Sequence, residues 1–163
     1  MSKEIRLTAD ELMLMSVFQT FTGIRPMNCV LEGDNIFFIV DSEDIPKLVA
    51  EFRHLPSVSR ALRSKSAEAA ILRECTRELS RALKKNVYIV KYSSDPKEFL
   101  RNFFMLRPDE TVEIVNRSGG RRYAIVRVQP KRKGVVIGRG GFRAKVAREL
   151  AKQYFELETV LIR

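Results

Sequence analysis

The stretch GVVIGRGGFRAKVARELAKQYF, residues 134–155, sets Gly138, Arg139, Gly140 and Gly141 between two apparent helices. Glycine is costly within a helix, but it permits a tight reversal and lets another molecule approach the backbone closely. The start of a helix leaves backbone N–H groups unpaired and carries partial positive charge, so it attracts phosphate. Arg139 adds a full charge at the tip, and five further cations flank the turn: Lys131, Arg132, Lys133, Arg143 and Lys145. The segment therefore predicts a turn that binds the phosphates of a polyanion.

The residues around this turn predict the element order αββααβ. Asp95 and Pro96 suit the cap and first position of a helix that buries an aromatic stripe of Phe99, Phe103 and Phe104. Alternating runs joined by Ser118-Gly119-Gly120 predict a hairpin. The expected elements are a helix from Pro96, strands over 110–118 and 121–129, a short helix over 130–138, a longer helix over 142–155 and a strand over 157–163.

The first half of the chain repeats this plan. Its expected elements are a helix over 8–23, strands over 26–33 and 35–41, a helical stretch over 42–52, a helix over 66–86 and a strand over 86–92. We therefore expect two α/β (α+β) domains, 1–94 and 95–163, each with a three-stranded sheet packed by helices. The first copy carries an insertion around 43–63, which we interpret as a protein-contact element. Ser64-Lys65-Ser66-Ala67 stands where the second copy has glycines, so we expect the first domain to bind a polyanion weakly or to serve as a packing partner.

Composition limits the class of protein. Hydrophobic residues make up 45% and charged residues 31%, which is typical of a packed globular chain. No apolar run reaches the roughly 18 residues that cross a bilayer, and the N-terminus has no secretory signal, so we expect a soluble cytoplasmic protein without a membrane partner. The net charge of +10 favours a polyanionic partner. Residues 95–163 hold 16 Lys and Arg against 8 Asp and Glu, whereas 1–94 hold 14 against 12.

The glycine turn and the elements around it resemble a known family. Ile137 to Gly141, within the order αββααβ, resembles the GXXG loop of a type II KH domain, and the resemblance covers residues 95–163. In KH domains this loop clamps about four nucleotides of single-stranded nucleic acid. The segments KYSSDPKEFLRNFF, VRVQPKRKGVVIGRGG and ELAKQYFELETVLI, and the opening LTADELMLMSVFQTFTG, are similar to the archaeal NusA-like transcription factors, a family with two tandem KH domains.

The resemblance implies a single-stranded RNA-binding protein of transcription termination or antitermination, with RNA polymerase as a further partner. Arg139 and Lys133 would pair with phosphates, while Arg143 and Lys145 would make outer contacts. Val136 and Ile137 would lie under the bases, or equally in the core. The expected RNA-binding residues are Lys133, Val136, Ile137, Gly138, Arg139, Gly140, Gly141, Arg143 and Lys145. A ribosome-associated KH protein, either a ribosomal subunit or an assembly factor, is the alternative function.

Other classes of function fit the residues less well. The glycines match neither GxxxxGK[ST] nor GxGxxG, so a nucleotide-binding enzyme is not expected. The single histidine, His54, has no evident catalytic partner, and Cys29 and Cys75 are far apart without a CxxC pair, so we expect buried reduced thiols and no zinc site. The sequence thus predicts no enzyme, no metal, no cofactor and no small-molecule substrate. The Phe99 stripe could form an exposed protein-binding surface, but core packing is the simpler interpretation.

Overall fold

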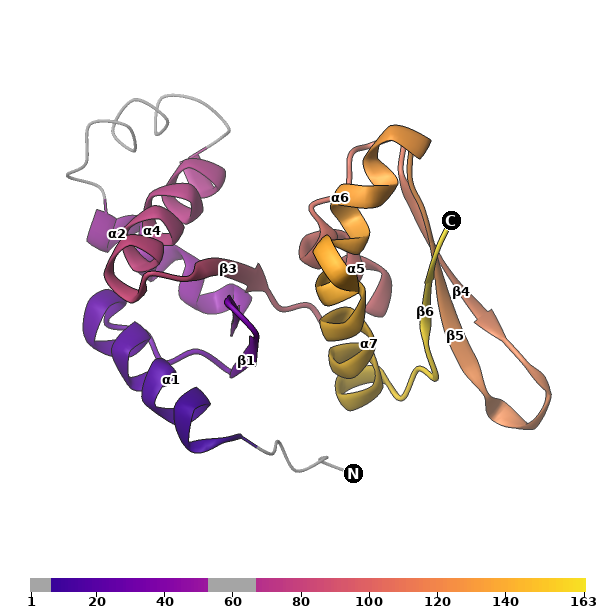
Figure 1. The fold of residues 1–163 in the computed structure, drawn as a ribbon, viewed down its shortest axis with the longest axis horizontal. Coiled ribbons are helices and arrows are strands. Elements are labelled where there is room, and N and C mark those ends of the chain that lie inside the picture. Colours follow the sequence, from indigo (N-terminus) through magenta and orange to yellow (C-terminus); the bar gives the residue numbers. More distant parts are fainter. Residues whose placement is uncertain (1–6, 53–66) are drawn as a thin grey trace. The chain divides into compact units, whose positions relative to one another are not determined.

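The computed structural model describes residues 7–52 and 67–163, drawn as a ribbon in Figure 1. Internal contacts divide the chain into two units, one extending to Tyr92 and the other beginning at Ser93. His54, most of the predicted insertion and Ser64 to Ser66 lie outside the described residues. Within the part that is described, no helix combines the length and apolar character needed to cross a membrane.

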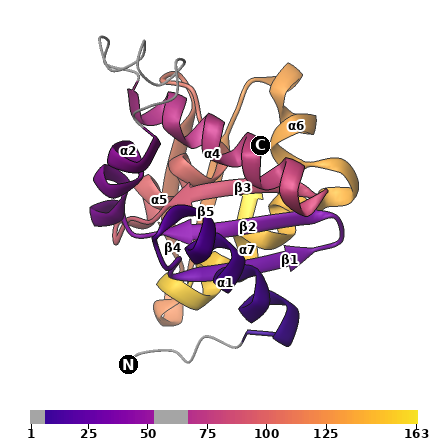
Figure 2. The same cartoon turned by 90° about the vertical axis from the view of Figure 1, so that its left-hand side faces the viewer.

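The first unit is built on a three-stranded sheet in the order β1-β2-β3, as the view in Figure 2 shows. Strands β1 and β2 are antiparallel, and β2 and β3 are parallel. The elements are α1 (Ala9–Thr22), β1 (Asn28–Glu32), β2 (Asn35–Val40), η1 (Ser42–Asp44), α2 (Ile45–Phe52), α4 (Ala67–Leu83) and β3 (Asn86–Lys91). The strands and helices predicted for this half are confirmed within the described residues.

The second unit repeats the topology, with sheet order β4-β5-β6, β4 antiparallel to β5, and β5 parallel to β6. Its elements are α5 (Pro96–Phe104), β4 (Thr111–Asn116), η2 (Ser118–Gly120), β5 (Arg122–Arg127), η3 (Pro130–Arg132), α6 (Lys133–Ile137), η4 (Arg139–Gly141), α7 (Phe142–Phe155) and β6 (Val160–Ile162). The predicted fold class, two three-stranded sheets packed by helices in tandem KH-like domains, is confirmed.

Local capping explains where the first helix begins and ends. The Thr8 hydroxyl accepts a hydrogen bond from the Glu11 amide at 3.1 Å, and Glu11 Oε1 accepts one from the Thr8 amide at 3.0 Å, which forms a capping box. Gly23 ends α1 with φ +77°, a left-handed conformation that favours glycine. Glu11 Oε2 also accepts from the Leu31 amide at 2.8 Å, so the cap ties α1 to β1.

Each unit has its own aromatic core. In the first, the Phe18 and Phe38 rings lie 4.6 Å apart. Cys29 and Cys75 are both free and buried, as expected from the sequence. Burial raises the pKa of the two thiols to about 12, with a further contribution from Glu11 at Cys29. In the second unit, the phenylalanines of the predicted stripe are buried on α5, so core packing is confirmed over the exposed alternative.

Candidate nucleic-acid interface

The turn between α6 and α7 has a backbone that requires glycine. Gly138 adopts φ +85° and ψ 159°, a combination that residues with a side chain essentially avoid. Gly140 and Gly141 follow in the left-handed region with φ +66° and +78°. The Gly138 amide closes α6 on the Gly134 carbonyl at 3.0 Å, and the Gly141 amide donates to the Gly138 carbonyl at 2.9 Å. These bonds hold the turn as a defined structure between the two helices.

Gly138 also meets a steric limit that the other glycines of the turn do not. A Cβ atom at this position would lie 2.8 and 2.9 Å from two ring carbons of Phe142 and 3.0 Å from Cγ of Arg143. A Cβ atom at Gly140 or Gly141 would have no neighbour within 4 Å. Gly138 is thus required for internal packing, whereas Gly140 and Gly141 leave open space beside the backbone for another molecule.

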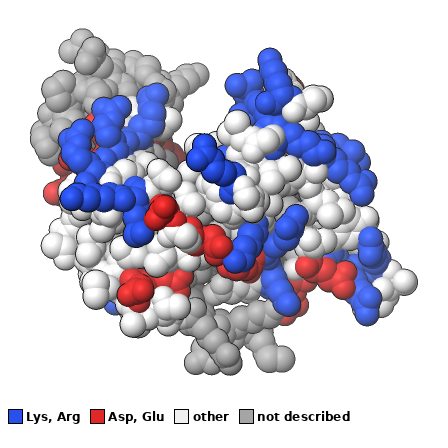
Figure 3. Space-filling model, in the orientation of Figure 1, with Lys and Arg blue, Asp and Glu red and all other residues white. Residues whose placement is uncertain are grey.

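The N-terminus of α7 is open to an anion. Helix α7 is 14 residues long, and among the described residues no side chain caps its first turn. The partial positive charge at the start of a helix favours an anion there. Figure 3 shows Lys and Arg side chains gathered over the region of α6 and the turn that follows it. The exposed cations in this region are Lys131, Lys133, Arg139 and Lys145.

Three of these cations are available to a ligand. Lys131, Lys133 and Arg139 form no ion pair with any acidic residue in 7–52 or 67–163, and all three are exposed. An anion at the turn therefore does not have to displace an acidic side chain from them. Lys145 is exposed one turn into α7, where it extends the same positive field.

Arg143 departs from the exposed outer contact that the sequence predicted. Its side chain is 6% exposed and lies beneath the turn. Nη1 donates to the Val135 carbonyl at 3.1 Å, and Nη2 donates to the Phe103 carbonyl at 3.4 Å. Arg143 thereby joins the first turn of α7 to α6 and to α5. Because its guanidinium donates inward to backbone carbonyls, it supports the turn from below.

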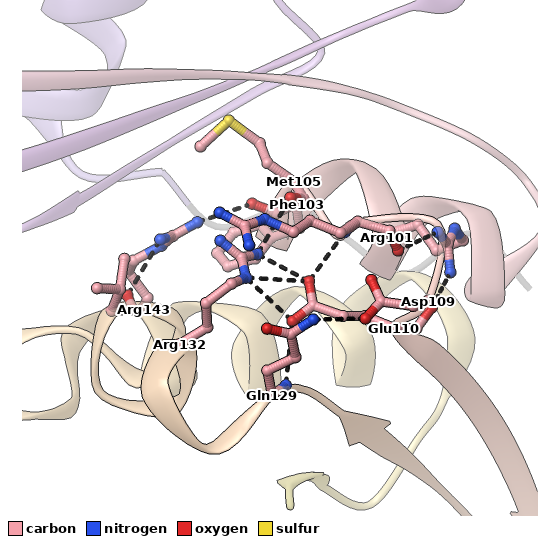
Figure 4. A network of polar contacts seen from close by, with 10 residues as sticks. Arg101, Phe103, Met105, Asp109, Glu110, Gln129, Arg132 and Arg143 are labelled. Atoms are coloured by element: carbon pink, nitrogen blue, oxygen red, sulfur yellow. Dashed lines mark hydrogen bonds and ion pairs between the residues drawn. The ribbon is translucent and has the colours of Figure 1, made fainter.

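A second arginine of the predicted basic cluster is also engaged internally, as Figure 4 shows. Arg132 Nη2 lies 2.8 Å from Oε1 of Glu110, and Nε donates to Oε2 at 3.0 Å, which gives a two-pronged ion pair. Glu110 is 1% exposed and the Arg132 side chain is 18% exposed. Glu110 also accepts from the backbone amides of Arg107 at 2.9 Å and Gln129 at 3.3 Å.

This network holds the segment that leads into α6. Glu110 lies just before β4, while Gln129 and Arg132 lie between β5 and α6, so one carboxylate joins both ends of the hairpin to the start of the short helix. Arg101 strengthens the same corner, because it donates to the carbonyls of Glu110 at 2.6 Å and Arg107 at 3.0 Å. Sequence reasoning missed Glu110, since nothing local to it signals a partner 22 residues away.

The network predicts an acid-sensitive second unit. Hydrogen bonds from Arg132 lower the pKa of Glu110 from 4.5 to about 2, against the opposing effect of burial and with further help from two backbone amides. Because the folded pKa lies below the unfolded value, the stabilisation is fully present above about pH 4.5 and is lost as the pH falls towards 2. We expect the urea concentration at which residues 93–163 unfold, measured by hydrogen exchange, to fall as the pH is lowered through this range. A Glu110→Gln variant should show a shallower acid dependence, and an unchanged slope would contradict the assignment.

The apolar residues of α6 divide between core and surface. Val136 is 1% exposed, so of the two alternatives left open by the sequence the structure places it in the core. Ile137 is half-buried beside the turn. Val135 is 63% exposed on the same short helix, and sequence reasoning did not single it out. The run of three apolar residues, Val135 to Ile137, could have indicated it, because three consecutive side chains of a helix cannot all point to the core.

Comparisons with known proteins give this geometry a context. A probable transcription termination protein NusA from Methanocaldococcus jannaschii is 24% identical over 160 residues, which cover 98% of this chain and 75% of that protein. The protein of the same name from Thermoplasma acidophilum is 23% identical over 160 residues, which cover 98% of this chain and 96% of that protein. A third, from Methanococcus vannielii, is 23% identical over 138 residues, which cover 84% of this chain and 67% of that protein. This chain is thus NusA-like in sequence over nearly its whole length.

The fold of this NusA-like protein has a counterpart among solved structures. The crystal structure of APE1850 matches it with a TM-score of 0.61 and 25% sequence identity, over 96% of this chain and 100% of that chain. No protein-family model matches the sequence. The likeness therefore extends through both units of the NusA-like chain and is not confined to the glycine turn.

Proposed function

We propose that this NusA-like protein binds single-stranded RNA through the turn Gly138–Gly141 and acts in transcription termination or antitermination in the cytoplasm. One observation carries the RNA-binding part. Gly138, Gly140 and Gly141 hold positive φ values directly before an uncapped helix of 14 residues, with exposed cations on both sides. This is the arrangement expected of a loop that admits a phosphate backbone. The names of the three archaeal relatives support the role in transcription.

The mechanism follows from the positions of the side chains. Phosphates approach the start of α7 over Gly140 and Gly141, where no side chain obstructs them, and Arg139 and Lys133 pair with phosphate oxygens. Lys145 makes an outer contact, while Arg143 holds the turn from below. Ile137 and the exposed Val135 offer apolar surface to the bases. Such contacts hold the strand in register, while sequence preference comes from hydrogen bonds to base edges.

The proposal extends to the domains and to a protein partner. We assign residues 1–94 and 95–163 to the first and second KH domains, and the RNA clamp to the second. Ser64-Lys65-Ser66-Ala67, of which the first three lie outside the described residues, replaces the glycines in the first, so we infer weaker RNA binding there. RNA polymerase is the proposed protein partner. Co-purification of polymerase subunits would support it, whereas recovery of ribosomal subunits alone would favour the ribosome-associated alternative.

The proposed clamp predicts a large loss of RNA affinity when the turn becomes acidic. The double substitution Arg139→Asp plus Gly140→Asp places negative charge and side-chain bulk where phosphate is expected. We expect affinity for short single-stranded RNA to fall at least tenfold, or about 1.4 kcal/mol. Fluorescence anisotropy over a salt series measures this change. The salt dependence should also become shallower, because each lost phosphate contact removes about one unit of slope or slightly less.

The chain offers a matched control at the end of α1. Gly23 is exposed with φ +77° and, like Gly140, has nothing within 4 Å of the position that a Cβ atom would take, and Arg25 is exposed nearby. The pair Gly23→Asp plus Arg25→Asp changes the net charge equally and strains the backbone in the same way. Its RNA affinity should stay within about twofold of the natural chain, since nonspecific charge effects are small at physiological salt. Equal losses in the two double variants would refute the clamp.

A further inference from the structure

The sheet β4-β5-β6 has one face that the helices of its unit leave uncovered. Side chains alternate along β5, so Ala124 and Val126, which are fully buried, point to the helices, while Tyr123, Ile125 and Arg127 point to the other face. On that face Ile125 is 5% exposed between Glu113 and Leu161 of the neighbouring strands, whereas Arg127 is exposed. Figure 1 shows α5, α6 and α7 on one side of these strands. Tyr123 lies opposite Val115 on the neighbouring strand, and its ring is half-buried. A half-buried aromatic ring thus lies on the sheet face that is turned away from these helices.

An arginine lies over this ring. The guanidinium carbon of Arg117 is 4.5 Å from the centroid of the Tyr123 ring, which is a cation–π contact. Arg117 is exposed, and its amide donates to the Arg121 carbonyl at 2.6 Å, which closes the hairpin and fixes the backbone beneath the pair. No acidic residue among those described is paired with Arg117. Aromatic rings and guanidinium planes are the surfaces on which unpaired bases stack.

Two further arginines of β5 and its turn are held only by long, exposed ion pairs. Arg121 lies 3.6 Å from Glu158, and Arg127 lies 3.8 Å from Glu113, in two exposed and loosely closed ion pairs. Such pairs contribute little stability, so both arginines can turn to a phosphate at small cost. Arg117 and Arg121 flank the turn of the hairpin, while Arg127 lies at the other end of β5, on the same face of the strand as Tyr123. The combination of cations and an aromatic plane fits a single strand of nucleic acid.

The hairpin end lies far from the glycine turn. Arg122 Nη2 donates to the Phe155 carbonyl at 2.8 Å, so the hairpin end meets the C-terminus of α7, whereas the glycine turn forms the N-terminus. The length of α7 puts the two sites about 20 Å apart, at 1.5 Å of rise per residue. An RNA of about four nucleotides, which fills a GXXG clamp, would therefore not reach Tyr123.

We propose that Arg117 and Tyr123 form a second RNA contact site, on which a base stacks beyond the reach of the glycine turn. The inference rests on the proposed function for the identity of the ligand, single-stranded RNA. The second unit would then contact one RNA strand at two sites, with phosphates bound at the N-terminus of α7 and a base stacked near its C-terminus.

The test compares two RNA lengths with substitutions at Tyr123. Tyr123→Leu keeps an apolar side chain but removes the aromatic plane, and Tyr123→Phe keeps the plane. With an oligouridine about three times longer than the four-nucleotide clamp length, we expect Tyr123→Leu to lower affinity about fivefold or more and Tyr123→Phe to leave it unchanged. With the four-nucleotide RNA, neither substitution should matter. In addition, 4-thiouridine in the long RNA should photo-cross-link to the peptide that contains Tyr123.

Two results would refute the second RNA contact site. If Tyr123→Leu leaves the long RNA unaffected, or weakens both lengths equally, the second site is refuted. The Arg139→Asp plus Gly140→Asp variant separates this result from failure of the proposed clamp. Loss of binding in that variant alone keeps the clamp and removes the second site, whereas loss in Tyr123→Leu alone does the reverse. Retention of a polymerase partner but no RNA binding by the natural chain would refute both.

Discussion

Replacing Glu110 by glutamine is expected to lower the free energy of unfolding of residues 93–163 by about 3–5 kcal/mol, the usual result of removing one member of a buried ion pair. The carboxylate is 1% exposed and accepts from both Arg132 and two backbone amides. Glutamine has a similar volume, so no cavity forms. It leaves the Arg132 guanidinium, whose side chain is only 18% exposed, without its ion-pair partner, and the NH2 group of glutamine faces donors that need an acceptor.

Urea unfolding with residue-resolved hydrogen exchange would assign this loss to the second unit, because a chain of two units need not unfold in one step. Glu113→Gln is the matched control, since Glu113 pairs with Arg127 at 3.8 Å while 58% exposed, and less than about 1 kcal/mol is expected there. Glu110→Leu together with Arg132→Leu should recover much of the stability, because no charge is then left buried. Equal effects of the two single glutamine substitutions would show that the Glu110 network does not stabilise the unit.

The second large effect is expected at Gly138. Alanine there must adopt φ +85° and ψ 159°, and its Cβ atom would lie 2.8 Å from the Phe142 ring. Backbone strain and overpacking each cost about 1–3 kcal/mol, so we expect Gly138→Ala to destabilise the second unit by about 3 kcal/mol or more. The Phe142 ring must move to accept the methyl group, and RNA affinity should fall with it.

Gly140→Ala provides the comparison within the same turn. Gly140 has φ +66°, but nothing lies within 4 Å of the Cβ position, so only the left-handed backbone opposes the substitution. The expected cost is about 1–2 kcal/mol. Thermal and urea unfolding of the two variants, measured side by side, would separate packing from backbone strain. If Gly138→Ala were no more damaging than Gly140→Ala, the contact with Phe142 would not be a constraint on this turn.

Most of the architecture could be predicted because its signals are local. Thr8 with Glu11, and Asp95 with Pro96, mark helix starts through bonds made within one turn, and the structure shows both caps. Gly23 and the alternating runs around Gly119 mark a helix end and a hairpin in the same way. The αββααβ order of each half follows from such short-range patterns, and so does the fold class.

The support beneath the glycine turn could not be predicted, because it depends on contacts between distant residues. Arg132 and Arg143 are indistinguishable in the sequence from the exposed cations beside them, since composition records charge and not direction. The structure shows that Glu110 holds the first and the carbonyls of Val135 and Phe103 hold the second. Glu110 lies 22 residues from Arg132 in the sequence, and Phe103 lies 40 residues from Arg143. Only the folded topology brings these partners together.

The engagement of Arg132 and Arg143 affects how related sequences should be compared. Each guanidinium spans two acceptors in a fixed plane, a geometry that the rounded ammonium group of lysine cannot reproduce. Lysine at either position would preserve the charge and yet release the turn from its support. At exposed Arg139, by contrast, we expect lysine to serve nearly as well in the proposed phosphate contact. A similarity score that treats arginine and lysine as equivalent therefore overlooks the replacements that would harm the glycine turn most. Whether a distant relative keeps arginine at the positions of Arg132 and Arg143 should decide whether it keeps this turn.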